Sequence, residues 1–239
     1  MFGGWDCQEG REGGTWLACN KQGQVALLTN IYTGGIINQK AKGRGNLVVD
    51  FLKGNFSPEE YLTNIKEELS VYNPFNLILF EPGEDGYTVW RLGRGLADHS
   101  DDFGPVHAKF GTFGVSNHPQ HRQYIKAEKG ETKLRELVSS IRSEDDLFIQ
   151  LECLLKNTEE NWPDPQIIEQ SVVRGNPGPF QHLGPQLSSI FVDIKQNGYG
   201  TRTHSMILVD NQWNLHYKEI TKEGDSWRQT EEKFNVKQT

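Results

Sequence analysis

The sequence lacks the features that mark several large classes of protein. Its three cysteines, Cys7, Cys19 and Cys153, are odd in number and form no CxxC pair, so we interpret them as free thiols of a reducing compartment. The longest apolar runs, such as 76–80 and 205–209, fall far short of the ~20 residues that span a bilayer. The first residues match no targeting signal. These absences predict a soluble, intracellular protein without a transmembrane segment.

Concentrated positive charge and metal-binding spacings are also missing. The formal net charge is -7, and Lys and Arg gather only in the short stretch 40–44, which argues against a nucleic-acid partner. The seven histidines show neither HExxH nor C2H2 spacing, and Pro119 separates the closest pair, His118 and His121. We therefore predict no metal site. No CxxCH is present, and because axial haem ligation has no reliable spacing, haem cannot be inferred from spacing.

The composition that remains is that of a folded domain. Hydrophobic residues make up 35% of the 239 residues and charged residues 24%, and both are spread along the chain. A chain of this length can bury a sizeable core. We predict a single domain over residues 1–239.

Local patterns predict strands and helices that are grouped rather than alternating. The predicted strands are 15–20, 25–30, 76–80, 87–92, 112–117, 189–195, 204–209 and 214–220, with a weaker one at 227–234. The predicted helices are 44–53, one that starts at Ser57-Pro58, one carrying the apolar residues of 134–141, and 143–155. Gly23 is expected to take positive φ in the first hairpin, and Gly54 to end the first helix. This grouping predicts an α+β fold with antiparallel sheets and separate helical layers.

Glycines crowd the stretch 10–14, immediately before a predicted strand. Such a cluster predicts a tight turn or a close approach of the backbone to another group. Phosphate binding is not predicted here, because there is no GxGxxG, no P-loop Lys-Ser/Thr and no preceding strand.

Three polar residues are placed where elements end. Asn30 and Asn117 each follow a predicted strand, where an amide either caps a turn or donates to an oxyanion. Arg202 follows the glycine turn 197–200, where it is either a solvated strand-edge residue or a guanidinium held at the mouth of a site. The residues alone leave both alternatives open in each case.

Seven motifs in order along the chain resemble the transport and Golgi organisation 2 homologue family, also called the NRDE family. They are GREGGTWL at 10–17, LTN at 28–30, KGRG at 42–45, YNPFNL at 72–77, GVSN at 114–117, PDP at 163–165 and GYGTRT at 198–203. The resemblance implies an N-terminal nucleophile hydrolase-like fold, with four layers in the order αββα. That fold agrees with the grouping of strands and helices.

Members of this family begin Met-Cys and then carry an Asn-Arg-Asp-Glu motif, which this sequence does not show. Residue 2 is Phe, so the resemblance implies that an N-terminal strand segment and the nucleophile of the hydrolase fold are missing. Such enzymes use the side chain of residue 1 as nucleophile and its α-amino group as base. Cys7 is internal and aligns with a part of the pattern that has no cysteine. We therefore expect no catalytic residue in this chain.

In hydrolases of this fold, Asn side chains help to form the oxyanion site and an Arg lies beside the nucleophile. By resemblance, Asn30, Asn117 and Arg202 are the candidate residues of the remaining cleft, with Thr29 and Thr201 as neighbours. We predict that these side chains converge around one cleft.

The resemblance implies a non-catalytic haem-trafficking or chaperone-like protein, with links to Golgi organisation, secretion and mitochondrial or lipid metabolism. Its ligand would be haem or a lipid or acyl compound. Its location would be cytoplasmic, with mitochondrial and Golgi association. The alternative is an N-terminal cysteine amidohydrolase that cleaves acyl-amide bonds in its full-length form and is inactive here.

Overall fold

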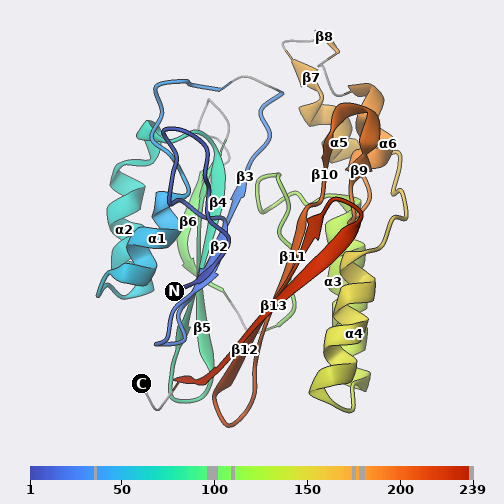
Figure 1. Ribbon diagram of the computed structural model, residues 1–239. Coiled ribbons are helices and arrows are strands. Elements are labelled where there is room, and N and C mark those ends of the chain that lie inside the picture. The colour runs from blue at the N-terminus through green and yellow to red at the C-terminus, as the bar shows by residue number, and fades with distance from the viewer. Residues whose placement is uncertain (35–36, 96–101, 109–110, 174–175, 178–180, 237–239) are drawn as a thin grey trace. The chain divides into compact units, whose positions relative to one another are not determined.

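The protein has a mixed α+β fold with antiparallel pairing in its sheets. A computed structural model describes residues 1–34, 37–95, 102–108, 111–173, 176–177 and 181–236 (Figure 1). The chain forms two compact units. Unit 1 comprises Met1–Phe110, Val209–Leu215 and Lys233–Thr239, and unit 2 comprises Gly111–Leu208 and His216–Glu232. Each unit is described by itself.

Unit 1 is built on a six-stranded antiparallel sheet. Its strands follow one another in chain order: β1 (Phe2–Gly3), β2 (Leu17–Cys19), β3 (Val25–Asn30), β4 (Phe75–Pro82), β5 (Tyr87–Arg94) and β6 (Phe103–His107). β3 and β4 pair from Val25↔Phe80 to Asn30↔Phe75. The predicted hairpin of the first two long strands is confirmed as β2 and β3, and Gly23 has φ +85°.

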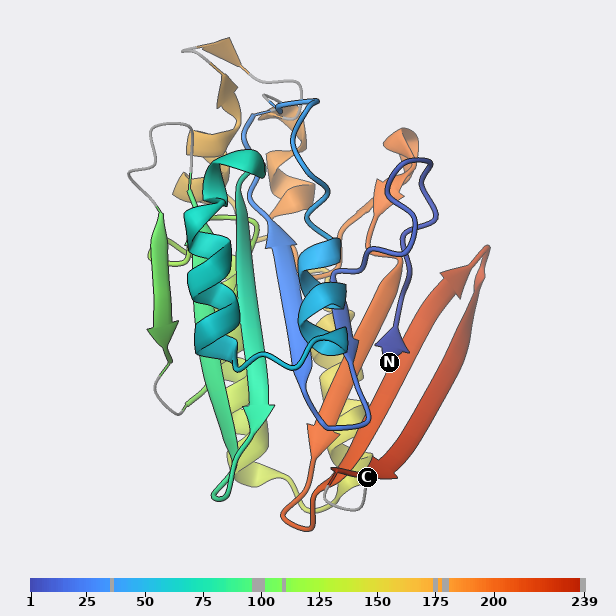
Figure 2. The same cartoon turned by 90° about the vertical axis from the view of Figure 1, so that its left-hand side faces the viewer.

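Two helices cover one face of this sheet (Figure 2). α1 (Asn46–Lys53) and α2 (Pro58–Glu67) pack on β3, β4 and β5, and the short 3₁₀ helix η1 (Leu69–Val71) follows α2. The core between helices and sheet includes Leu28, Phe51, Leu62, Phe75 and Leu77, all essentially inaccessible to solvent. Burial of such side chains contributes about 1.5–3 kcal/mol each.

The ends of these helices follow from single residues. Ser57 caps α2, because its Oγ accepts a hydrogen bond from the Glu60 N–H (3.3 Å). Gly54 ends α1, and its N–H donates to the Asp50 carbonyl (2.9 Å). A Cβ at Gly54 would lie 2.9 Å from that same oxygen. Both predicted helix boundaries are confirmed.

Unit 2 contains the longer helices. They are α3 (Ile125–Ser140), α4 (Glu144–Leu155), α5 (Pro165–Gln170) and α6 (Gly184–Leu187), with the short helices η2 (Gln181–Leu183) and η3 (Lys195–Asn197). α3 and α4 pack side by side, as predicted, and Ser143 caps α4. The apolar residues of 134–141 mark only the second half of α3, which begins at Ile125. Val138 is 57% exposed, so apolar spacing is a poor guide to the buried face of this helix.

The remaining strands lie in small sheets. β7 (Val172–Val173) pairs with β8 (Asn176–Pro177), and β9 (Asp193–Ile194) pairs with β10 (Tyr199–Gly200). A three-stranded sheet has the order β11 (Thr203–Val209), β12 (Asn214–Glu223) and β13 (Ser226–Asn235). Within unit 2, Phe148 of α4 packs against Met206 and Ile220 of this sheet. The three predicted C-terminal strands 204–209, 214–220 and 227–234 are confirmed.

Two predicted strands are wrong. Residues 112–117 form no strand. The Gly114 N–H, which a strand would pair with a neighbouring backbone, instead donates to the Glu131 carboxylate (3.0 Å), and Gly114 packs closely on α3. Of 189–195, only Asp193–Ile194 is a strand, since the Lys126 ammonium binds the Ser189 carbonyl (3.0 Å). The sequence also missed β6, which lies in the predicted loop before residue 112.

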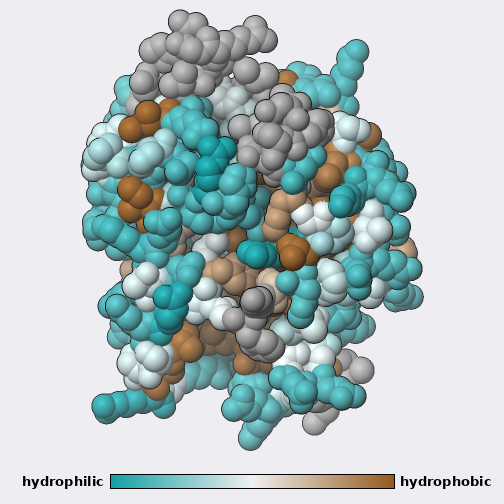
Figure 3. All heavy atoms as spheres, turned by 180° about the vertical axis from the view of Figure 1, so that it is seen from behind, coloured by the Kyte–Doolittle hydropathy of each residue, from teal (hydrophilic) through white to brown (hydrophobic). Residues whose placement is uncertain are grey.

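The surface is largely hydrophilic on the face shown in Figure 3. None of the helices in the described ranges is long and apolar enough to cross a membrane. Cys7, Cys19 and Cys153 are free thiols, as predicted, and Cys19 is buried.

Candidate small-molecule site

Asn30 is one of the residues that line a cavity of about 400 Å³ in unit 1. The other lining residues come from segments 6–16 and 37–46 and include Asn73. We call this cavity the glycine-loop pocket, after the glycines at 10, 14, 43 and 45 in its wall. Every lining residue belongs to unit 1.

The first wall is the tight turn that the glycine cluster predicted. The Asp6 N–H donates to the Gly14 carbonyl (2.8 Å), and the Gly13 N–H donates back to the Asp6 carbonyl (2.9 Å). Gly10 and Gly13 have φ of +78° and +79°, a region that glycine enters without steric cost. This turn holds Arg11 at its tip, where the side chain is exposed.

The second wall packs against the first through glycine backbone. The Thr15 N–H donates to the Gly45 carbonyl (3.2 Å). A Cβ on Gly45 would lie 2.9 Å from the Thr15 nitrogen and 3.0 Å from the Gly14 Cα. The GREGGT and KGRG motifs therefore need glycine at Gly14 and Gly45 because their backbones touch.

Arg44 connects this second wall to the ends of two strands. Its Nη1 donates to the Pro74 carbonyl (2.6 Å), which also accepts the Ile31 N–H (3.1 Å). Pro74 and Ile31 immediately flank the last pair of the β3–β4 ladder, Asn30↔Phe75. The half-buried guanidinium of Arg44 is therefore fixed close to Asn30.

Amide side chains hold the rim. Asn73 Oδ1 accepts the Asn38 N–H (2.8 Å), and Asn73 Nδ2 donates to the Asn38 carbonyl (3.0 Å). Lys42 forms an exposed ion pair with Glu68 (3.0 Å), so its charge is already compensated. The two hydrogen bonds from Asn73 thus fix the backbone of the rim at Asn38.

The charged residues that line the pocket are Arg11, Arg44, Lys42, Asp6 and Glu12. Burial, and secondly the positive charge of Arg11, lower the pKa of Arg44 to about 10. At this pKa the Arg44 guanidinium still carries its charge at neutral pH. Within the described ranges, no carboxylate forms an ion pair with either of them. The pocket therefore places two like charges near each other.

The structure brings two of the predicted site residues together. Asn30 lines the pocket, and Thr29 precedes it at the end of β3. The Thr29 hydroxyl accepts a hydrogen bond from the buried amide of Asn76 (3.1 Å) on the adjacent strand. Thr29 thus braces the strand end that carries Asn30.

The other three predicted residues belong to unit 2. Asn117 is exposed and does not follow a strand, which corrects the prediction; its carbonyl accepts hydrogen bonds from Tyr124 (3.3 Å) and Gln170 (3.0 Å). Arg202 is exposed. The Thr201 hydroxyl accepts the Val192 N–H (3.0 Å) and so has a structural role. Convergence of all five residues around one cleft stays a prediction.

Arg11 and Arg44 are the functional candidates that sequence reasoning missed. Both stand inside glycine motifs; Arg44 is next to Gly45, and Arg11 lies three residues before Gly14. Glycines at 10, 13 and 14 predicted a turn or a close approach, but the partner of that approach is some thirty residues away. A pair of glycine motifs that each carry an Arg is the signal that could have identified them.

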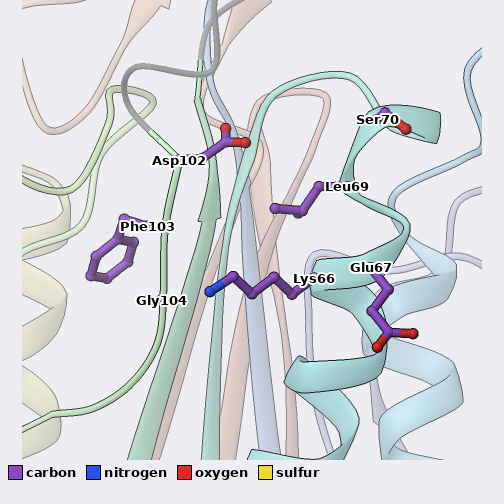
Figure 4. A pocket seen from close by; sticks show the side chains of 7 residues that line it. All are labelled: Lys66, Glu67, Leu69, Ser70, Asp102, Phe103 and Gly104. Carbon is purple, nitrogen blue, oxygen red and sulfur yellow. The ribbon is translucent and has the colours of Figure 1, made fainter.

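Two other cavities are less suited to a specific ligand. One of about 520 Å³ lies in unit 1 between α2 and β6 (Figure 4). There Lys66 extends toward Gly104, whereas Glu67 points away, and the Asp102 carboxylate already accepts the Gly95 N–H (2.5 Å). The other, of about 790 Å³, is a hollow of mixed charge along α3 and α4 in unit 2. No group of three or more metal-binding side chains occurs among the described residues.

Comparison with known proteins places the chain in a family. The family model for transport and Golgi organisation 2 matches residues 1–223. The chain belongs to the transport and Golgi organisation 2 family. This confirms the resemblance found in the seven motifs.

The curated relatives cover nearly the whole chain. The transport and Golgi organization protein 2 homolog of Bos taurus is 33% identical over 99% of this chain and 83% of its own length. The Homo sapiens homolog is 34% identical over 92% of this chain and 76% of its own length. The Drosophila melanogaster protein of the same family is 30% identical, over 94% and 77% respectively. Their names associate this family with Golgi organisation.

Proposed function

We propose that this member of the transport and Golgi organisation 2 family is a non-catalytic carrier, a haem-trafficking or chaperone-like protein of the cytoplasm with mitochondrial and Golgi association. The observation that carries the proposal is the lining of the glycine-loop pocket. The lining offers cations, two carboxylates, amides and two exposed apolar side chains, but its described residues include no thiol. The Thr15 hydroxyl is occupied, since it donates to the Leu17 carbonyl (3.1 Å). These groups suit binding better than nucleophilic chemistry.

The apolar part of the pocket gives a place for a flat ligand. Trp16 and Ile37 are 48% and 47% exposed, although both are large apolar residues. A planar macrocycle can cover these side chains, while its carboxylates reach the guanidiniums of Arg11 and Arg44. The described residues of the lining include no His, Cys or Met, so the proposed contacts are to the edge and face of haem rather than to its iron.

A haem titration of the purified chain tests this proposal. We expect a saturable Soret shift that is weakened in Trp16→Ala. Trp5→Ala is the matched control, because Trp5 is also 48% exposed but does not line the pocket. Partitioning equal to that of an unrelated acidic protein, or equal loss in the two variants, would contradict the proposal.

The proposal extends to the fold. We propose that the antiparallel sheets and helices described above belong to a four-layer αββα arrangement of the N-terminal nucleophile hydrolase type, formed as a single domain. The six-stranded antiparallel sheet covered by α1 and α2 supports two of these layers. An experimental structure with α3 and α4 on a second stacked sheet would bear it out; separate, independently moving units would not.

The second candidate is an N-terminal cysteine amidohydrolase that acts in a form with Cys after the initiator Met. It is favoured by Asn30, whose side chain comes from the end of β3 at a pocket, where an amide can donate to an oxyanion. The test is an acyl-amide panel given to that form and to its Cys→Ala variant. Turnover that the variant keeps, or no turnover at all, argues against this candidate.

A further inference from the structure

Arg11 and Arg44 line the same cavity, and neither forms an ion pair among the described residues. Arg44 is fixed by its bond to the Pro74 carbonyl, and Arg11 stands on the rigid glycine turn. Two guanidiniums at close range repel each other, and that repulsion is stronger where protein replaces water. An arrangement of this kind is relieved when an anion lies between the two groups.

Two acidic residues, Asp6 and Glu12, also line the pocket, and neither forms a described ion pair with Arg11 or Arg44. Asp6 Oδ1 accepts the Gln8 N–H (2.8 Å), so it stabilises its own turn. Glu12 is exposed, and no ion pair to Arg11 or Arg44 occurs within the described part of the chain. Lys42 is paired with Glu68. Arg11 and Arg44 are therefore the cations of the lining that form no ion pair among the described residues.

Neutral donors and apolar surface complete the arrangement. Asn30 and Asn46 line the same cavity, and Asn46 is the first residue of α1, whose N-terminal Gly45 provides no side-chain cap. Trp16 and Ile37 present their exposed apolar area to the same cavity. A ligand that satisfies the whole pocket thus has an oxygen-rich anionic end and an apolar body.

We propose that the glycine-loop pocket binds the oxyanion group, carboxylate or phosphate, of a small amphipathic molecule. Arg11 and Arg44 bind the oxygens, and Trp16 and Ile37 pack against the apolar body. Planar guanidiniums can donate two parallel hydrogen bonds to either group, which a lone ammonium cannot. The inference rests on the proposed carrier function and specifies the ligand chemistry that the carrier recognises.

Calorimetric titration with matched probes tests the oxyanion. Octanoate, octyl phosphate and octanol share one chain and differ in their head group, and inorganic phosphate has the head group alone. We expect octanoate or octyl phosphate to bind at least about tenfold more tightly than octanol, the size of one hydrogen bond to a charged group. The tighter of the two anions identifies the ligand as a carboxylate or a phosphate. Equal affinity for octanol overturns the proposal.

Variants of the arginines test the position of the site. Arg11→Gln removes an exposed charge that makes no described side-chain bond, so folding is preserved, and we expect about a tenfold loss of anion affinity with octanol binding unchanged. Arg44→Lys keeps the charge and loses the planar fork, so it should show a smaller loss. Arg142→Gln, an exposed arginine of unit 2, is the control. Losses equal to those of the control overturn the proposal.

The outcomes separate this proposal from the carrier function. If haem binds but the anionic probes bind no better than octanol, the carrier stands and the oxyanion site is wrong. If the probes bind through Arg11 while haem only partitions, the site stands and haem is the wrong cargo.

Discussion

Asp164 is a residue of unit 2 whose substitution should strongly lower the stability of the fold. Its carboxylate is buried, and its Oδ1 accepts the N–H groups of Gln166 (2.9 Å) and Ile167 (3.2 Å) at the start of α5. Its Oδ2 accepts the Ile125 N–H (2.7 Å) at the start of α3. One side chain therefore caps two helices that are 39 residues apart in the chain.

Asp164→Ala should lower the free energy of unfolding by about 2–4 kcal/mol. The reason is that three backbone N–H groups lose their acceptor, and a lost N-cap alone costs about 1 kcal/mol. Urea unfolding followed by far-UV circular dichroism measures the change. Asp193→Ala, at an exposed position of unit 2, is the control. Similar midpoints for the two variants would show that the double cap contributes little.

This arrangement was not predicted from the sequence, where PDP at 163–165 served only as a family motif. Asp followed by Pro is nevertheless a normal helix start, so the cap of α5 had a local signal. The bond to Ile125 was not predictable, since it depends on how two segments far apart in the chain pack together. The same limit applies to Arg44, whose partner carbonyl at Pro74 lies thirty residues away.

At the level of elements, the contact between the two glycine motifs provides a matched pair of substitutions. Gly45 touches the Thr15 nitrogen and Gly14, whereas a Cβ added at Gly43 would have no atom within 4 Å. Gly45→Ala should destabilise the protein by about 1–3 kcal/mol, because the two backbones must separate. Gly43→Ala should be neutral or slightly stabilising, because it restricts the unfolded chain.

Thermal unfolding of these two variants, combined with the octanoate titration, checks this expectation. The Gly45 variant should lose both stability and anion affinity, because Arg44 is next to the displaced residue. The Gly43 variant should retain its stability. Equal behaviour of the pair would mean that the close approach of the two motifs has no energetic consequence.

Element prediction succeeded where a local signal defines both ends. The β2–β3 hairpin, α1, α2 and α4 each carry a turn glycine or a cap within a few residues. It failed at 112–117, where the local pattern suited a strand but the backbone is bound by side chains. There the Glu131 carboxylate of α3 accepts a hydrogen bond from the backbone N–H of Gly114. A competing side chain from a distant element leaves no trace in the local pattern.

At the level of the molecule, unit 1 depends on residues far along the chain. The Trp213 ring packs on Tyr87 of β5, with ring centroids 5.8 Å apart, and the Trp213 carbonyl accepts the Val236 N–H (2.9 Å). Val236 in turn covers Gly23, where a Cβ would lie 2.4 Å from its side chain. Two segments from the C-terminal part of the chain thus pack against the sheet of unit 1.

Trp213→Ala should therefore destabilise unit 1 by about 1–3 kcal/mol, through loss of the half-buried ring. Trp213 has φ +65°, a conformation that is equally unfavourable for alanine, so the substitution reports on the loss of the side chain alone. Thermal unfolding followed by far-UV circular dichroism measures it. Trp5→Ala, an exposed position in the same unit, should change little. A similar shift in both variants would refute the role assigned to Trp213.

The sequence could not have predicted this division. Composition and length suited one domain, and three of the boundaries of unit 1 fall inside strands of the C-terminal sheet, in β11, β12 and β13, rather than at a loop rich in Pro or Gly. The candidate site shows the same limit: Asn30 was located in a pocket of unit 1, while Asn117 and Arg202 belong to unit 2.

The discontinuity of unit 1 has a consequence for synthesis on the ribosome. Residues 1–110 leave the exit tunnel first, and the whole of segment 111–208 follows before Trp213 is made. Phe2 stacks on Phe234, with ring centroids 5.3 Å apart, so this contact forms only after β13 has been made. The growing polypeptide thus carries an unfinished sheet edge until then, a stage at which aggregation competes with folding.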